Sequence, residues 1–204
     1  LEFTYQNVLM GKQERIGQAM CIIDGKGQEA VLMTGDIPTV VPEDELTGIK
    51  VTPPGGKSYD AELLGRDIEE GISFVRIKGS HSFKALRFAA TANLKLGQRV
   101  YSVGLLGPNS GDAPYLGTGI VAAMLQLPDE IVYVTGGELT IASSPVFNAG
   151  GQVIGIVGEQ KPMEVNLMLG GRWVNTVMTQ RQRTNFFIPI DEFAHVIEAM
   201  PAPG

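Results

Sequence analysis

Short apolar runs separated by turn residues repeat along most of the chain. The runs are rich in Val, Ile, Thr, Tyr and Phe, and clusters of Gly, Pro, Asn and Asp lie between them. This pattern is typical of an all-β sandwich or barrel. It predicts a first set of strands at 16–23, 30–34, 49–52, 59–64 and 72–77. A second set is predicted at 99–103, 115–124, 131–135, 145–147, 153–157, 165–169, 173–178 and 185–188. Two barrels account for these strands better than one barrel does.

Helical periodicity is strong only near the end of the chain. Asp191 is a suitable N-cap, and the apolar residues that follow recur at helical spacing along one face. These residues are Phe193, Val196, Ile197 and Met200. We therefore expect one domain over 1–204, with a first barrel at 1–88, a second barrel at 89–188 and a helix with a linker at 189–204.

Composition and charge exclude several classes of function. The 204 residues carry a formal net charge of −6 without a run of Lys and Arg, which argues against a nucleic-acid partner or an anionic membrane surface. No apolar run is long enough to cross a bilayer. One cysteine and two histidines exclude a disulfide framework and a Cys/His zinc site. Cys21 stands in an apolar run and is expected to be a buried strand residue.

Six motifs, in order, connect the chain to a known family. Residues 142–156 read ASSPVFNAGGQVIGI, and this segment resembles the nucleophile region of trypsin-like serine proteases of the HtrA branch. Similar matches occur at YDAELLGRD (59–67), ISFVRIK (72–78), LGQRV (96–100), GTGIVAA (117–123) and FFIPI (186–190). The resemblance implies a double β-barrel of the trypsin/chymotrypsin type with a C-terminal helix.

The same resemblance places the catalytic triad on residues that lack its chemistry. The nucleophile position falls on Ala142, the histidine position on Asp36 and the aspartate position on Gly71. The position that shapes the oxyanion hole falls on Thr140. Because the mechanism needs a serine hydroxyl activated by an oriented histidine, the alignment predicts a pseudoprotease without enzymatic activity or cofactor.

Other residues could in principle replace the lost triad. Ser143 and Ser144 stand where the family has two glycines, and a serine hydrolase with a rearranged site around either of them is the alternative function. Ser110 lies in a segment that imitates a nucleophile motif, but its position relative to 153–156 is wrong, so we expect a loop residue. His81 follows a strand in a Gly/Ser turn and is expected to be exposed, and His195 is expected on the helix surface.

The groove between the barrels is the expected site of peptide binding. By resemblance, Val157, Gly158 and Glu159, with Thr140, are the positions that would meet an extended polypeptide through β-augmentation. An ordinary edge strand is the competing interpretation. If the Gly158 N–H serves a partner strand, Gly158→Pro should leave the fold intact and abolish capture.

An added hairpin is predicted at 165–169 and 173–178, around Gly170-Gly171. It carries the only tryptophan, Trp173, and either covers the second barrel or forms an apolar partner surface.

A cluster of acids is the only candidate for a cation site. Asp36 would face Asp67, Glu69 and Glu70 across the groove, but acids at turns are usually solvated, so we expect no metal. The expected partner is a polypeptide or protein, including flanking domains of the same chain. The resemblance implies a periplasmic or extracellular location.

Overall fold

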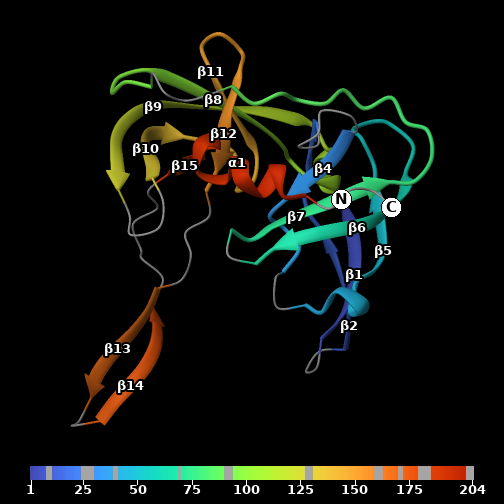
Figure 1. Ribbon diagram of the computed structural model, residues 1–204, viewed down its shortest axis with the longest axis horizontal. Coiled ribbons are helices and arrows are strands. Elements are labelled where there is room, and N and C mark those ends of the chain that lie inside the picture. The colour runs from blue at the N-terminus through green and yellow to red at the C-terminus, as the bar shows by residue number, and fades with distance from the viewer. Residues whose placement is uncertain are drawn as a thin grey trace.

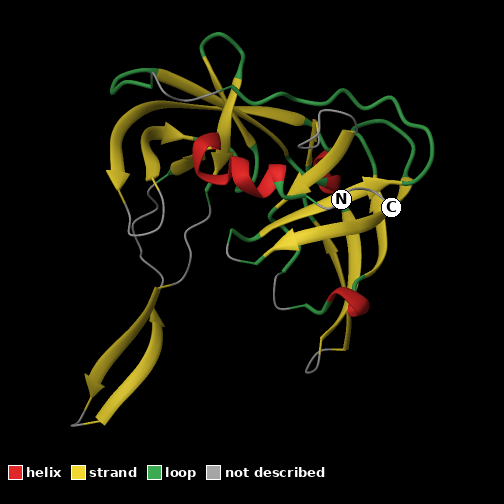
Figure 2. Cartoon of the chain, viewed as in Figure 1, coloured by secondary structure: helices red, strands yellow, loops and turns green. Residues whose placement is uncertain are grey.

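Two β-lobes and a C-terminal α-helix make up most of the computed structural model (Figures 1 and 2). The structure describes residues 1–7, 11–23, 30–38, 41–68, 70–89, 94–126, 131–158, 163–169, 172–178 and 185–200. The expected all-β fold class with a C-terminal helix is confirmed. Of the two lobes, the second is a closed barrel and the first is a seven-stranded sheet.

The first lobe is a seven-stranded antiparallel sheet. Its strands are ordered β2-β1-β5-β6-β7-β4-β3. They are β1 (Glu2–Asn7), β2 (Gly11–Ile16), β3 (Met20–Ile23), β4 (Ala30–Thr34), β5 (Thr47–Val51), β6 (Tyr59–Asp67) and β7 (Ile72–Ile77). A short 3₁₀ turn, η1 (Glu43–Glu45), precedes β5. Apolar side chains from β1, β4, β5 and β7 fill its core.

The first hairpin differs from what the sequence pattern predicts. A single strand at 16–23 was wrong, because β2 ends at Ile16 and β3 begins at Met20. Strands β1 and β2 form a hairpin that the pattern missed. Its second strand reads GKQERI and is largely exposed, so it lacks the alternation of apolar and polar residues that marks a half-buried strand.

The second lobe is a closed six-stranded barrel in the order β10-β15-β12-β11-β8-β9. Its strands are β8 (Arg99–Leu105), β9 (Pro114–Gln126), β10 (Ile131–Glu138), β11 (Pro145–Asn148), β12 (Val153–Val157) and β15 (Phe186–Pro189). The segment between β8 and β9 contains a second 3₁₀ turn, η2 (Pro108–Ser110). Val100, Val146 and Phe187 are completely buried in the centre of this barrel.

The added hairpin forms a sheet of its own. Strands β13 (Met163–Leu169) and β14 (Arg172–Met178) pair antiparallel, which confirms the two predicted strands. In Figure 1 the pair lies away from both lobes. The turn at Gly170-Gly171 and the side chain of Trp173 lie outside what the structure describes, so the two interpretations of this hairpin stay open.

Helix α1 (Ile190–Glu198) joins the two lobes through one apolar cluster. Phe193, Val196 and Ile197 are buried against side chains of β3, β4 and β7 from the first lobe and Ile156 from the second. The predicted N-cap at Asp191 is wrong, because the helix begins at Ile190 and Pro189 occupies the cap position. Among the described residues, no helix has the length and apolar character needed to cross a membrane.

Candidate functional site

The three positions aligned with a catalytic triad come from segments that meet between the lobes. Asp36 follows β4, Gly71 closes the turn before β7, and Ala142 lies in the loop before β11. A methyl group placed on Gly35 would lie 3.6 Å from the Gly71 carbonyl and would overlap the Ser143 hydroxyl. The fold therefore brings the segments around Gly35, Gly71 and Ser143 close together.

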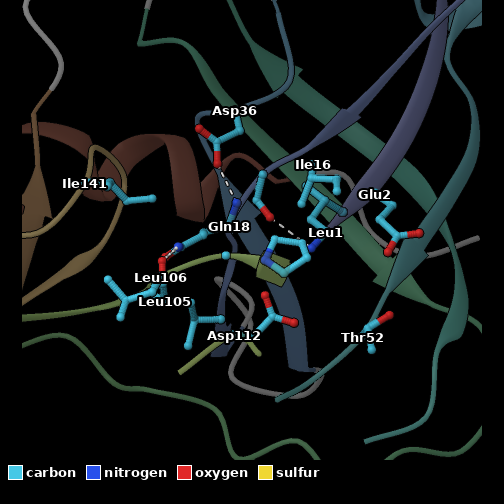
Figure 3. A pocket seen from close by; sticks show the side chains of 13 residues that line it. Leu1, Glu2, Ile16, Gln18, Asp36, Thr52, Leu105, Leu106, Asp112 and Ile141 are labelled. Carbon is cyan, nitrogen blue, oxygen red and sulfur yellow. Dashed lines mark hydrogen bonds between the residues drawn. The ribbon is translucent and has the colours of Figure 1, made fainter. Parts of the chain in front are cut away.

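Asp36 is held in a main-chain interaction rather than left open in the groove. Its Oδ2 accepts a hydrogen bond from the Gln18 main-chain N–H at 2.5 Å (Figure 3). The Thr34 hydroxyl donates to the Gln18 carbonyl at 2.6 Å and accepts from the Asp36 N–H at 3.0 Å. Asp36 and Thr34 together fix the backbone of the segment that links β2 to β3.

Gln18 in turn bridges the two lobes. Its Nε2 donates to the Leu105 carbonyl at 2.5 Å, and its Oε1 accepts from the Leu105 N–H at 3.1 Å (Figure 3). The Gln18 side-chain amide thus makes the same pair of hydrogen bonds to Leu105 that a main-chain residue of a neighbouring antiparallel strand would make. Asp36, which aligns with the histidine position, is thereby connected through Gln18 to β8 of the second barrel.

The loop around Ala142 is tightly packed. Ser143 has φ of 64°, a left-handed conformation that the glycine of the family motif adopts more easily. The Ser143 N–H donates to the Val157 carbonyl at 2.8 Å, and the Val157 N–H donates to the Ser144 carbonyl at 2.9 Å. Thr140 is buried, and its N–H donates to Ser102 Oγ at 2.7 Å.

These hydrogen bonds correct the expected peptide-binding strand. Both main-chain groups of Val157 are used inside the protein, and the Gly158 N–H donates to the Phe186 carbonyl at 3.0 Å. The prediction that the Gly158 N–H is free for a partner is therefore wrong. Glu159 lies outside the described residues, so its assignment stays a prediction.

The substitute nucleophiles and bases do not assemble into a catalytic arrangement. Ser110 lies in η2, as expected for a loop residue. His81 is half-buried rather than exposed, because its ring packs edge-on against Phe83 with centroids 5.4 Å apart. His195 is exposed on α1. Two pockets lie between the lobes, and neither histidine is among the described residues that line them.

The acidic residues considered for a cation have other roles. Asp67 Oδ1 accepts the Glu70 N–H at 2.9 Å and closes the turn before β7. Glu69 lies outside the described residues. Within the described parts of the chain, no group of three or more His, Cys, Asp or Glu residues is arranged to hold a metal ion.

The Gln18–Leu105 bridge separates two pockets, and both residues line both of them. The first pocket, of about 390 Å³, contains the carboxylates of Glu2, Asp36 and Asp112 (Figure 3). The second, of about 330 Å³, is lined mainly by apolar side chains. Sequence reasoning missed Gln18 and both pockets, because their walls come from segments far apart in the chain and carry no local motif.

Comparisons with known proteins agree with this architecture. A family model described as the trypsin-like peptidase domain matches residues 28–156. A probable serine protease do-like of Buchnera aphidicola subsp. Acyrthosiphon pisum (strain APS) is 25% identical over 111 residues, which are 54% of this chain and 23% of the relative.

Solved structures of an HtrA-type protease share the fold. A variant of the protease AlgW with a tripeptide matches with a TM-score of 0.61 and 17% identity, covering 97% of this chain and 58% of that one. AlgW with a decapeptide matches with a TM-score of 0.60 and 17% identity, covering 95% and 55%. The chain thus spans less than two thirds of each of these relatives.

Proposed function

The chain belongs to the trypsin-like peptidase domain family, and from that premise we propose that it is a non-catalytic, HtrA-like member that binds a polypeptide. The observation that carries the proposal is the state of Asp36. At the position of the catalytic base stands a carboxylate whose oxygen accepts the Gln18 N–H. In this proposal, Asp36 stands in place of the histidine that would transfer a proton, and it holds the main chain at Gln18 instead.

The chemistry of acyl transfer supports the absence of catalysis. A serine protease needs a hydroxyl nucleophile, an imidazole base and a carboxylate that orients it. Ala142 has no nucleophilic atom and Gly71 has no side chain. A carboxylate has an ordinary pKa near 4, so it is a weak base at neutral pH. A groove that lacks these three residues can still bind a polypeptide, because binding does not require them.

A polypeptide is the ligand class that the fold supports best. Two HtrA-type structures with the same fold are described with a tripeptide and with a decapeptide. The groove of this chain keeps two pockets between its lobes. We infer that its partner is an extended polypeptide or a flanking domain of the same protein, in a periplasmic or extracellular location.

The alternative function is a serine hydrolase that uses Ser143 or Ser144. Its support is the Ser144 hydroxyl, which is buried and has no hydrogen-bond partner among the described residues. Its weakness is the lack of a base, since neither histidine lines the groove. A covalent probe separates the two functions directly.

The test combines binding and turnover on one substrate. Fluorescein-labelled casein is mixed with the purified chain, and anisotropy reports binding while fragment release reports cleavage. We expect binding without cleavage and no labelling by a fluorophosphonate. Cleavage and labelling that both disappear in Ser143→Ala or Ser144→Ala would establish the hydrolase instead. Absence of both binding and cleavage would overturn the proposed function.

Restoring the nucleophile alone is a second test of the same proposal. Ala142→Ser supplies a hydroxyl, but Asp36 is held by Gln18 and Gly71 offers no orienting group. We expect casein turnover by Ala142→Ser to remain at the background of the unmodified chain. Turnover above that background would show that a base does reach position 142.

A further inference from the structure

The two pockets beside the Gln18–Leu105 bridge differ in chemistry, and this difference identifies what the groove can bind. In the first pocket, Glu2, Asp36 and Asp112 contribute negative charge, and no Lys, Arg or His side chain is among its described lining residues (Figure 3). Ile16 and Ile141 add apolar surface and are 61% and 42% exposed. This pocket is therefore complementary to a group that joins a cation to an aliphatic stem.

The three carboxylates of the first pocket come from both lobes. Glu2 begins β1 and Asp36 follows β4 in the first lobe, whereas Asp112 lies between β8 and β9 in the second. A positively charged group in this pocket is therefore attracted from both sides.

The second pocket is apolar and contains one unsatisfied polar group. Met20 and Leu86 from the first lobe face Val103 and Phe147 from the second. Ser144 also lines this pocket, is only 3% exposed, and its Oγ has no hydrogen-bond partner in the described parts of the chain. A buried hydroxyl without a partner carries a desolvation cost, which a main-chain carbonyl of a bound polypeptide would relieve while an apolar side chain fills the rest of the pocket.

We propose that the groove selects an extended polypeptide in which an apolar side chain fills the pocket at Ser144 and a nearby Lys or Arg enters the pocket of Glu2 and Asp112. This inference rests on the proposed function and names the class of polypeptide. Alternate residues of an extended segment point to the same side, so residues i and i+2 can enter two pockets that share a wall. Charge complementarity sets the choice of a basic residue over an acidic one.

The experiment uses an array of labelled decapeptides with a Ser/Ala background, varied at two positions two residues apart. Binding to the purified chain is measured by anisotropy at low and high salt. We expect Leu, Ile or Phe to be preferred at one position and Lys or Arg at the other. The preference for the basic residue should weaken as the salt concentration rises. No preference at either position would overturn the inference.

Variants of the chain assign each preference to its pocket. Glu2→Gln combined with Asp112→Asn should weaken binding of the basic peptides by about threefold or more and should not weaken binding of the acidic peptides. Glu198→Gln removes one negative charge from the exposed face of α1 and serves as the charge control. Val103→Asp should reduce binding of all apolar peptides. Equal effects of the pocket and control variants would contradict the assignment.

Casein binding separates the two levels of failure. If casein binds and the array shows no preference, the inference fails while the proposed function stands. If neither casein nor any peptide binds, both fail.

Discussion

At the scale of single residues, the segments that align with a catalytic triad meet in close contacts between the two lobes. Ser143 adopts a left-handed backbone conformation and places its hydroxyl against the Cα of Gly35. Gly35 comes from the first lobe and Ser143 from the second. The absence of a side chain on Gly35 is thus what allows the two segments to approach.

Gly35→Ala tests this close approach. The added methyl group would overlap the Ser143 hydroxyl, so we expect a loss of about 1–3 kcal/mol in the free energy of unfolding. Ser143→Gly in the same chain removes the overlapping atoms and should recover most of that loss. Chemical denaturation of the two single variants and the double variant measures the coupling. Strictly additive effects would mean that the two residues do not meet.

Cys21 provides a residue-scale prediction about pH. It lies half-buried in β3, and burial raises the pKa of its thiol. Because a higher pKa leaves less thiolate at a given pH, alkylation by iodoacetamide should rise at higher pH in the folded chain than in the chain unfolded by urea. Mass spectrometry of samples quenched at several pH values follows the reaction. Identical pH profiles in the two states would contradict the prediction.

At the scale of elements, strand β12 was expected from the sequence to offer a free edge to a ligand, but in the fold it is paired on both sides. It lies between β11 and β15 in the barrel, and the following residue, Gly158, continues the pairing by donating to the Phe186 carbonyl. The ladder therefore extends past the last residue of the strand. A ligand at this place cannot use the donors that the sequence suggested.

Gly158→Pro should destabilise the fold, whereas the sequence alone predicted that this change would leave the fold intact. Proline removes the N–H that Phe186 accepts, and a side chain at Gly158 would overlap the Phe186 ring. We expect a loss of about 2–4 kcal/mol in the free energy of unfolding. Thermal unfolding followed by circular dichroism measures it. An unchanged melting temperature would show that this hydrogen bond and this contact are dispensable.

At the scale of the whole molecule, the lobes are joined by two different kinds of contact. Helix α1 supplies an apolar one, in which Phe193 is completely buried and packs edge-on against Phe88 at 5.6 Å. The Gln18–Leu105 bridge supplies a polar one on the floor of the groove. The helix fixes how the lobes pack, whereas the bridge fixes the shape of the two pockets.

Gln18→Ala should separate the contribution of the Gln18–Leu105 bridge to stability from that of helix α1. It removes both hydrogen bonds to Leu105, which contribute about 1–3 kcal/mol together, and merges the two pockets. Unfolding should remain cooperative because α1 still joins the lobes. Glu14→Ala, at an exposed position of strand β2, is the control. A loss no larger than that of the control would mean that the bridge contributes nothing to stability.

Much of the fold could be predicted because its signals are local. Turn residues and β-branched runs located most of the strands, and the spacing of Phe193, Val196 and Ile197 located the helix. The hairpin of β1 and β2 escaped prediction because β2 is mostly polar and exposed. The assignment of triad positions rests on the order of the family motifs and stays a prediction, whereas the structure does bring the segments at Gly35, Gly71 and Ser143 together.

The sequence by itself determined the fold class, the family resemblance and the residue types at the three positions that align with a triad. Tertiary structure alone decided how the available polar groups are used. Gln18 and Leu105 are 87 residues apart, and nothing in either segment marks the other as its partner. A main-chain N–H donates to any acceptor that the fold brings near, so the partner of Gly158 and the use of Asp36 follow from packing. The two pockets exist for the same reason, because their walls are assembled from both lobes.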